Sequence, residues 1–554
     1  MGEPARPELG GDAAATLTAD EIAELAPFGS ERAVTKGEIL FRAGDDAADL
    51  VVILDGEVEI IRSEREDDIV IAVHGAGRFV GELNLLTGQR PYLTARVSSP
   101  GRVIVIPQPQ FRRLMNSSVD LSDKIFRAFV ARRELLRTGE GAGAIRIIGS
   151  RYSPNAMALR AYANRIRLPH TWIDLEDIDD PDAVLTREGL TRADVPSVVL
   201  PTGVLRQPTP GEFAEQLGFT FHPVPGYLCD LAVIGIGPAG LAAAVYGASE
   251  GLDTISVDAA NLGGQAGSSS RIENYVGFPR GISGEELAAR AALQAQRLGA
   301  RLNAPCEVAG LRAENGFHVL TLVDGSELPC RAVVVATGAR YRRLDVDDLD
   351  RFEGAGVYYA ATDLEARVCA GSPVTVVGGG NSAGQAAIYL AQQQCDVSLA
   401  VRRDSLAATM SHYLVERVEA DARIEVLLST EVRAVDGDRH LERLTVEQTI
   451  TGERRTIACA GLFCFIGAVP ATSWLGNTVA LDNNGFILTD RSLPETVTRG
   501  VEYLHRAPLP FETSTPGVFA VGDVRNSSLK RVAAAVGEGS SAVRSVHDFL
   551  TIGA

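Results

Sequence analysis

Short apolar runs alternate with glycine turns from Val34 to Pro107. Runs of this length between turn residues are typical of β-strands, so the segment predicts a small β-roll. A helical pattern then extends from Gln108 to Arg137, and its basic last turn suits the negative end of a helix dipole. The predicted strands are Asp49 to Leu54, Glu57 to Ile61, Ile69 to Val73 and Arg102 to Ile106, with Gly56 and Gly101 among the turns.

A glycine-rich hinge at 139–143 precedes a second pattern, in which strands and a helix alternate. Apolar runs at Ile145 to Ile148, Thr171 to Asp174 and Val198 to Leu200 predict strands, and Asn155 to Ile166 predicts a helix. The second pattern is therefore that of a small α/β domain.

A strand, a glycine turn and a helix follow one another from Leu231 to Tyr246. The turn has the G-x-G-x-x-G pattern, in which glycines let a pyrophosphate approach the backbone N–H groups and the positive end of the helix. Asp258 ends the next apolar run, where a carboxylate can accept hydrogen bonds from ribose hydroxyls. The segment thus predicts a dinucleotide site, whose turn residues are Gly235, Gly237, Pro238, Ala239 and Gly240.

A second fingerprint of the same kind follows the apolar run Val374 to Val377. The next predicted strand, Val397 to Val401, ends in Arg402 and Arg403 and not in a carboxylate. Guanidinium groups at this position suit a 2′-phosphate, so the pattern favours NADPH over NADH. The turn residues are Gly378, Gly380, Asn381, Ser382 and Ala383.

Composition describes an ordinary globular protein of several domains, with 554 residues, 45% apolar and 22% charged. The net charge of −18 argues against a general nucleic-acid binder or a binder of anionic membranes. We find no run of 18 apolar residues and no secretory leader, we expect residues 1–18 to be a disordered tail, and a cytoplasmic location is the default.

The seven cysteines contain no C-x-x-C pair, which indicates a reducing compartment with neither a disulfide framework nor a zinc site. We expect no metal. Cys459 and Cys464 are the closest pair, and in one strand their spacing would direct them to opposite faces.

The β-roll, with its flanking helices at 19–138, resembles a cyclic-nucleotide-binding domain. Gly37-Glu38, Gly44-Asp45, Gly56 and Phe79 to Leu86 carry the resemblance. The resemblance implies that Glu82 binds the ribose hydroxyl and that backbone N–H groups beside it, near Gly81, bind the cyclic phosphate. Pro91 stands where the family has its phosphate-binding arginine, and Arg90 lies one residue early. The roll is thus either a cyclic-nucleotide site made by Gly81, Glu82, Arg90 and Thr94, or a retained fold that braces its neighbours or senses another signal.

Residues 144–222 resemble a glutaredoxin or thioredoxin fold, in which Pro196 would be the cis-proline. The family's C-P-x-C motif is replaced by Ser153-Pro154-Asn155-Ala156. A serine hydroxyl cannot replace a thiolate in disulfide exchange, so the resemblance implies a docking or packing module without redox activity.

The chain from Asp230 to Leu550 resembles the low-molecular-weight thioredoxin reductases. The resemblance is carried by the motifs at 235–240, 263–265, 272–279, 282–287, 335–338 and 517–524. It implies a discontinuous FAD domain at 226–341 and 482–554, an inserted NADPH domain at 342–481, a two-strand crossing between them, and a homodimer. The expected fold class is therefore multidomain: a β-roll, a thioredoxin-like α/β domain and two α/β dinucleotide-binding domains. The predicted FAD site comprises Gly235, Gly237, Pro238, Ala239, Gly240, Asp258, Gly264, Gln265, Asn274, Thr337, Gly338, Gly522, Asp523, Arg531 and Val532.

The redox dithiol of that family lies in a C-A-T-C segment, which matches Ala360-Ala361-Thr362-Asp363 here. Ala360 and Asp363 stand in place of the two cysteines, and neither can form a disulfide. Asp363 is either a general acid near the flavin or a residue that starts a helix.

The sequence therefore predicts an oxidoreductase in which NADPH reduces FAD and the electrons pass to an acceptor other than a resident dithiol. Oxygen, a quinone, a small redox protein and an external disulfide are all open as acceptors. Two alternatives remain: a ferredoxin- or flavodoxin-type NADP reductase, and a flavin-based redox sensor regulated through the β-roll.

Overall fold

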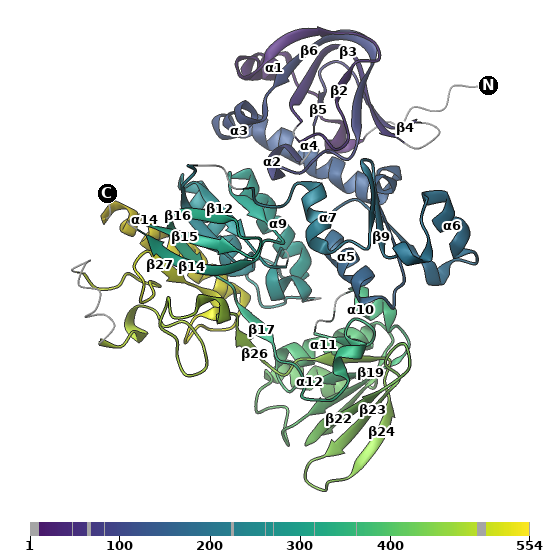
Figure 1. Ribbon diagram of the computed structural model, residues 1–554, viewed down its shortest axis with the longest axis vertical. Coiled ribbons are helices and arrows are strands. Elements are labelled where there is room, and N and C mark those ends of the chain that lie inside the picture. Colours follow the sequence, from purple (N-terminus) through teal and green to yellow (C-terminus); the bar gives the residue numbers. More distant parts are fainter. Residues whose placement is uncertain are drawn as a thin grey trace. The chain divides into compact units, whose positions relative to one another are not determined.

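The computed structural model describes most of the chain and divides it into two compact units. Unit 1 comprises Met1–Ser150, Ala158–Phe221 and Leu293–Pro305, and unit 2 comprises Arg151–Met157, His222–Ala292 and Cys306–Ala554. Figure 1 labels the elements of both units. The described residues are 10–46, 48–63, 68–81, 84–222, 226–260, 262–269, 271–314, 316–359, 361, 363–495 and 506–552.

The first part of unit 1 is a six-stranded antiparallel sheet with the order β1-β6-β3-β4, in which β2 pairs with β6 and β5 pairs with β3. Its apolar face packs against the two helices that follow it, around Phe79, Phe111 and Phe129. The predicted β-roll is thus confirmed. The elements are α1 (Ala19–Leu25), β1 (Ser30–Val34), β2 (Ile39–Phe41), β3 (Leu50–Ser63), β4 (Asp68–His74), β5 (Phe79–Val80), α2 (Asn84–Thr87), β6 (Thr94–Ile106), α3 (Gln108–Ser117) and α4 (Val119–Thr138).

Three local expectations in this part were wrong. Gly56 and Gly101 lie inside the long strands β3 and β6 and do not end them. The backbones of β3 and β6 approach closely where their register is irregular. A side chain would prevent this approach, because a Cβ on Gly101 would lie 2.0 Å from the Asp55 carbonyl oxygen. The helical pattern after the sheet is two helices, because the backbone is extended at Ser118.

A four-stranded sheet with the order β10-β9-β7-β8 follows in the chain. Strands β7 and β8 are parallel, whereas β9 is antiparallel to both β7 and β10. The Val195–Pro196 peptide bond is cis, as expected, and Ser153 caps α5 by accepting a hydrogen bond from Ala156 N at 3.3 Å. The elements are β7 (Arg146–Gly149), α5 (Pro154–Arg165), β8 (Thr171–Asp174), α6 (Pro181–Glu188), β9 (Ser197–Leu200), β10 (Gly203–Arg206) and α7 (Pro210–Leu217).

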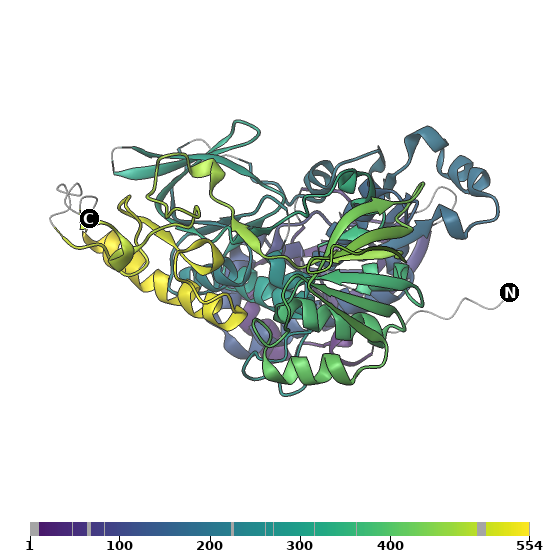
Figure 2. The same ribbon diagram turned by 90° about the horizontal axis from the view of Figure 1, so that it is seen from below.

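Unit 2 contains a sheet in which β12, β11, β16 and β27 pair in parallel and β16, β15 and β14 form an antiparallel meander. Strand β27 comes from the end of the chain, and the helix α14 that follows packs on α8 and on this sheet. Both views show α14 in yellow beside it (Figures 1 and 2). The elements are β11 (Cys229–Ile234), α8 (Pro238–Ser249), β12 (Thr254–Val257), β14 (Val308–Glu314), β15 (Phe317–Leu322), β16 (Glu327–Val335), β27 (Val518–Ala520) and α14 (Val532–Ile552). Between β12 and β14 in the chain, α9 (Gly284–Arg297) is divided between the two units and β13 (Arg301–Asn303) belongs to unit 1.

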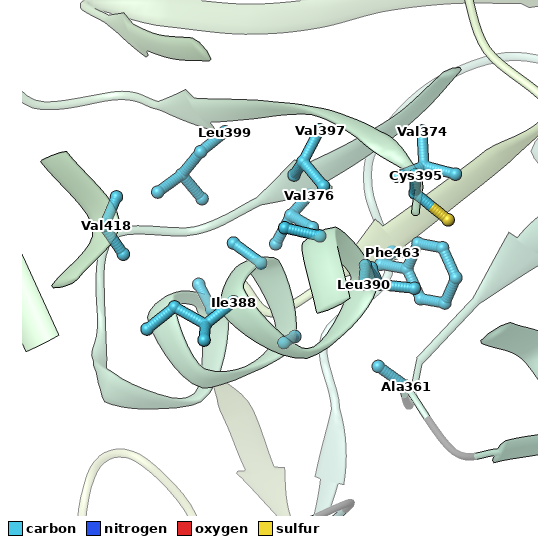
Figure 3. Packing of buried hydrophobic residues seen from close by; sticks show 14 of the residues in the cluster. Ala361, Val374, Val376, Ile388, Leu390, Cys395, Val397, Leu399, Val418 and Phe463 are labelled. Atoms are coloured by element: carbon cyan, nitrogen blue, oxygen red, sulfur yellow. The ribbon is translucent and has the colours of Figure 1, made fainter. Parts of the chain in front are cut away.

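The inserted part of unit 2 is a parallel sheet with the order β18-β25-β19-β20-β21, followed by an antiparallel sheet of β22, β23 and β24. Ile388 and Leu390 of α11 pack against Val374, Val376 and Leu399 of the parallel sheet (Figure 3). The two-strand crossing expected at its edge consists of β17 and β26. The elements are β17 (Ala339–Tyr341), β18 (Val357–Tyr358), α10 (Asp363–Val368), β19 (Pro373–Val377), α11 (Asn381–Gln392), β20 (Asp396–Val401), α12 (His412–Ala420), β21 (Ile424–Leu428), β22 (Thr430–Asp436), β23 (Arg443–Gln448), β24 (Arg454–Ala458), β25 (Gly461–Cys464) and β26 (Ala468–Pro470).

Six of the seven cysteines are buried, and Cys306 is partly exposed. The prediction that Cys459 and Cys464 face opposite sides was wrong: Cys459 precedes β25, and both side chains lie in one hydrophobic cluster. The fold also makes Cys229 and Cys330 direct neighbours on β11 and β16, a pairing that their separation in the chain gave no reason to expect. Within the described ranges, no helix is long and apolar enough to cross a membrane.

Candidate functional site

The first glycine turn joins β11 to α8 and is shaped by close contacts between backbones. Gly235 has φ +104°, and a Cβ there would lie 2.3 Å from the Ala336 carbonyl oxygen. A Cβ on Gly240 would lie 1.8 Å from the Gly235 carbonyl oxygen. By contrast, the nearest atom to a Cβ on Gly237 would be the Gly264 Cα at 3.9 Å. The outer glycines therefore let the chain pack on itself, and the middle one leaves room beside the start of the helix for a phosphate.

The second glycine turn, between β19 and α11, repeats this arrangement. Gly378 has φ +143°, and a Cβ there would lie 2.3 Å from the Phe465 carbonyl oxygen, whereas a Cβ on Gly380 would meet nothing within 4 Å. Asn381 fixes the turn, because its Oδ1 accepts from Ser411 N at 2.7 Å and its Nδ2 donates to Ser411 Oγ at 2.8 Å. Two turns of the same construction thus follow the carboxyl ends of parallel strands in two different sheets.

Asp258, at the end of β12, binds the first turn directly. Its Oδ2 accepts from Ile236 N at 2.7 Å and its Oδ1 from Ala260 N at 2.9 Å. Each carboxylate oxygen has a second lone pair, so the same side chain can still accept a hydrogen bond from a ribose hydroxyl.

Gln265 and Thr337 lie beside the crossing between the two sheets. Gln265 Nε2 donates to the Ala339 carbonyl oxygen, and Thr337 Oγ1 donates to the Ala471 carbonyl oxygen at 2.9 Å. Two other residues of the predicted FAD site are also described. Gly338 has φ +64°, and Asn274 is exposed.

Asp523 lies in a short turn after β27 that α14 holds in place. Gly522 N donates to Glu538 Oε2 at 2.7 Å, and Arg525 forms an ion pair with Glu538 at 2.7 Å. Burial raises the pKa of Asp523, Lys530 opposes this rise and Glu538 adds to it. Lys530 Nζ also donates to the Asp523 carbonyl oxygen at 2.9 Å.

Sequence reasoning missed Glu538 and Lys530. Glu538 had a signal: it is the first charged residue of a helix that begins Val532-Ala-Ala-Ala-Val-Gly and is otherwise made of small residues at this end. Such an isolated carboxylate on a packed helix face indicates a specific partner.

One cavity of about 790 Å³ brings part of both predicted sites together. Its lining includes the second glycine turn and, from the other sheet and the end of the chain, Gln265, Asp523 and Arg531. Arg402 and Arg403 also line it, both are exposed, and neither has an ion-pair partner within the part of the chain that the structure describes. Arg342 and Lys530 line it as well, and sequence reasoning assigned neither of them. Two further lining cations are paired with carboxylates: Arg343 with Asp350 and Glu353, and Arg433 with Glu431 and Glu447. The predicted residues on this lining are Gly378, Gly380, Asn381, Ser382, Ala383, Arg402, Arg403, Gln265, Asp523 and Arg531.

The other predicted residues of unit 2 stand outside this lining. Five of them form the first glycine turn, and Val532 is the first residue of α14. They are Gly235, Gly237, Pro238, Ala239, Gly240, Asp258, Gly264, Asn274, Thr337, Gly338, Gly522 and Val532.

Residues 229–539, more than half of the chain, match the pyridine nucleotide-disulphide oxidoreductase family. The chain belongs to this family. Residues 31–118 match the cyclic nucleotide-binding domain family. The first match supports the fold predicted for the thioredoxin reductase-like part of the chain, and the second supports the predicted N-terminal β-roll.

Similar proteins include a thioredoxin reductase of Streptomyces clavuligerus, which is 32% identical over 58% of this chain and 94% of its own length. A 34.2 kDa protein in the rubredoxin operon of Clostridium pasteurianum is 28% identical over 56% of this chain and 94% of its own length. Among solved structures, the T. acidophilum thioredoxin reductase is 28% identical with a TM-score of 0.52, covering 58% of this chain and 98% of that one.

Members of the thioredoxin reductase family use FAD and NADPH. The chain's own residues fit both groups: each turn leaves room at its middle glycine, and exposed guanidinium groups stand beside the second turn. Such a pairing of helix N-terminus and arginines is suited to the anionic parts of a dinucleotide.

Residues 360–363, which we expect to correspond to the dithiol segment of the thioredoxin reductases, are described only in part. Ala360 and Thr362 lie outside the described residues. Ala361 is buried and forms a parallel bridge with Ser269, and α10 begins at Asp363, which agrees with the helix-start interpretation.

Of the four residues predicted for a cyclic nucleotide, the three that the structure describes do not all line the cavity of the β-roll. Gly81 lines this cavity, and Glu82 lies outside the described residues. Arg90 instead pairs with Asp46 at 2.8 Å, and Thr94 Oγ1 accepts from Ala43 N at 3.1 Å.

Proposed function

We propose that this protein is an NADPH-dependent FAD oxidoreductase that passes electrons to an acceptor other than a resident dithiol. The observation that carries the proposal is the single cavity lined both by the second glycine turn and by Gln265, Asp523 and Arg531. A nicotinamide bound at that turn would lie in the same space as the groups predicted to surround a flavin. Bound FAD and NADPH supply hydride chemistry, and the chain supplies their placement.

The residues of each site have distinct tasks in this proposal. Arg402 and Arg403 bind the 2′-phosphate, and the start of α11 binds the pyrophosphate of NADPH. The start of α8 binds the FAD pyrophosphate, Asp258 holds that turn and accepts from the ribose, and Asp523 contacts the ribitol and phosphate region. The corresponding domains are 226–341 with 482–554 for FAD and 342–481 for NADPH.

Five of the seven cysteines are poorly suited to carry electrons away from the flavin. The sequence has no C-x-x-C pair, and burial raises the pKa of the thiols of Cys330, Cys395, Cys459 and Cys464 among others. A thiol in such surroundings is protonated at neutral pH and therefore a poor nucleophile. We infer that the acceptor is external: oxygen, a quinone, a small redox protein or an external disulfide.

The segment 144–222 supports a second part of the proposal, a docking module with a thioredoxin-like fold. Its sheet order β10-β9-β7-β8 and a helix capped by Ser153 are the features that favour this fold. Because it lacks both thiols, its role in this proposal is to bind and not to exchange disulfides. We further propose that the protein is a homodimer.

Anaerobic addition of NADPH to the purified flavoprotein, followed through the visible flavin absorbance, tests the hydride step. Bleaching by NADPH, followed by reoxidation with one of the candidate acceptors, is the expected result. A flavin that NADPH leaves oxidised would refute the proposal. Steady turnover with any acceptor would separate an enzyme from a pure redox sensor.

The double variant Arg402→Ala/Arg403→Ala tests the 2′-phosphate assignment. A charge-assisted hydrogen bond contributes about 1.5–3 kcal/mol, so we expect the KM for NADPH to rise by at least about tenfold. The KM for NADH, which lacks the 2′-phosphate, should stay unchanged. Arg455→Ala is the matched control, because Arg455 lies on β24 of the same part of unit 2 and pairs with Glu425 away from the cavity. Equal effects on NADPH and NADH would contradict the assignment.

A further inference from the structure

The β-roll of unit 1 encloses a second cavity, of about 290 Å³, between its strands and the end of α4. Its walls are mostly apolar and include Phe41, Ile60, Ile71, Leu93 and Leu136. Leu135 of α4 lines it as well, although this side chain is 46% exposed. An apolar wall with a few polar groups, partly open to solvent, is the usual construction of a small-molecule site.

Two buried polar groups on this wall have an atom without a hydrogen-bond partner among the described residues. Asn84 is 3% exposed and its Oδ1 has no partner, and His74 is 2% exposed and its Nδ1 has none. A buried polar atom left without a partner is costly, so such atoms in a native fold require an explanation. A bound molecule that donates a hydrogen bond to Asn84 Oδ1 would supply one.

The charge on the wall does not suit a cyclic phosphate. Among the described lining residues, Arg132 is the single cationic side chain. Its Nη1 donates to the carbonyl oxygens of Phe79 and Gly81 at 3.0 and 3.1 Å, and its Nε donates to that of Ala13 at 3.0 Å. The guanidinium is thus bound to the backbone of the roll, and Arg90, the other candidate, pairs with Asp46 outside the cavity.

We propose that this cavity binds an uncharged, largely apolar small molecule that donates one hydrogen bond to Asn84. A dry cavity of about 150 Å³ holds one benzene ring, so a cavity of this size suits about two fused rings. A bicyclic aromatic with a hydroxyl or N–H group has the required chemistry. The site is independent of the flavin chemistry proposed above, because it lies wholly in unit 1.

The binding test uses 2-naphthol and naphthalene as probes of the full-length holoprotein, measured by titration calorimetry. The hydroxyl of 2-naphthol can donate to Asn84, and naphthalene has the same rings without it. We expect one 2-naphthol per chain, bound at least fivefold more tightly than naphthalene. Cyclic AMP and cyclic GMP should neither bind nor compete.

Three variants locate the binding. Ala72→Leu fills the cavity from a buried position on its wall, and Leu135→Glu places a charge at its exposed edge; each should weaken 2-naphthol at least tenfold. Asn84→Leu should abolish the preference for 2-naphthol over naphthalene. Val119→Glu is the matched control for Leu135→Glu, because Val119 lies on the same helix, is 80% exposed and does not line the cavity, and it should change nothing.

Circular dichroism and the flavin spectrum establish that each variant is folded, and Leu135→Glu keeps the test decisive if a buried variant fails to fold. The proposal is overturned if wild type binds neither probe, or if Leu135→Glu and Val119→Glu bind 2-naphthol equally. It is also overturned if cyclic AMP or cyclic GMP displaces 2-naphthol.

Discussion

Removal of the Glu538 carboxylate should loosen the turn that carries Asp523. Glu538 Oε2 accepts from Gly522 N at 2.7 Å, Oε1 accepts from Ser528 Oγ at 2.9 Å, and the carboxylate pairs with Arg525 at 2.7 Å. The two charged side chains are only 13% and 16% exposed. In Glu538→Ala, the Arg525 guanidinium would therefore be left largely buried without its anion.

The magnitude follows from this burial. Removal of one partner of a buried ion pair lowers the free energy of unfolding by about 3–5 kcal/mol. Because both side chains keep some contact with solvent, we expect a loss at the lower end of this range, about 3 kcal/mol. For a domain of this size each kcal/mol lowers the Tm by about 2–4 °C, so we expect a loss of about 6–12 °C. Because Gly522 N also loses its acceptor beside Asp523, the variant should release FAD more readily.

Thermal unfolding followed through the rise in flavin fluorescence measures both effects, since the flavin becomes fluorescent when it is released. Asp548→Ala is the control: it removes a carboxylate from the same helix, where Asp548 and Arg544 form a pair at 3.4 Å with exposures of 44% and 82%. Such a surface pair contributes about 0.3–0.5 kcal/mol. If Glu538→Ala lowers the Tm no more than Asp548→Ala does, the Glu538–Arg525 pair does not hold the turn.

Two further predictions concern the first glycine turn and the β-roll. Gly235→Ala should yield protein without bound FAD, because φ +104° is strained for alanine and its Cβ would lie 2.3 Å from the Ala336 carbonyl oxygen. The ratio of flavin absorbance to protein absorbance measures the bound FAD. Gly251→Ala is the control for backbone strain alone, because Gly251 has φ +86° and a Cβ there would meet nothing within 4 Å. Burial lowers the pKa of His74 well below its ordinary 6.5, with Arg132 and Arg78 adding to the effect. The folded state therefore keeps His74 neutral while the unfolded chain binds a proton, so this contribution to stability is present above pH 6.5 and is lost as the pH falls below it. His74→Gln should reduce the loss of unit 1 stability on acidification, as measured by hydrogen exchange of the β-roll amides, and an unchanged pH dependence would exclude His74 as its source.

Local sequence was sufficient for the two glycine turns, and the reason is geometric. Each turn lies directly between a strand and a helix, so the residues that need glycine are neighbours in the chain, and their spacing is visible without the fold. The absence of cysteine at Ala360 and Asp363 could likewise be read directly from the sequence. The arginines at the end of β20 were found in the same way.

The contacts that assemble these parts depend on residues far apart in the chain, and only the tertiary structure decided them. Gln265 and Asp523 are more than 250 residues apart, yet both line the cavity that contains the second turn, because β27 returns the chain to the first sheet beside β16. Glu538 gained its role because α14 packs against the turn that carries Gly522.

The β-roll shows the same division between local and long-range information. Its alternating apolar runs predicted strands. Whether Gly56 and Gly101 end a strand or allow two paired strands to approach closely depends on the partner strand, which is remote in sequence. The pairing of Arg90 with Asp46 and the apolar cavity beside Asn84 are also products of packing. Sequence by itself thus determined the two glycine turns and the absence of a C-x-x-C pair, because both depend on residues that are neighbours in the chain. The two cavities, in contrast, form only where segments that are distant in sequence pack together.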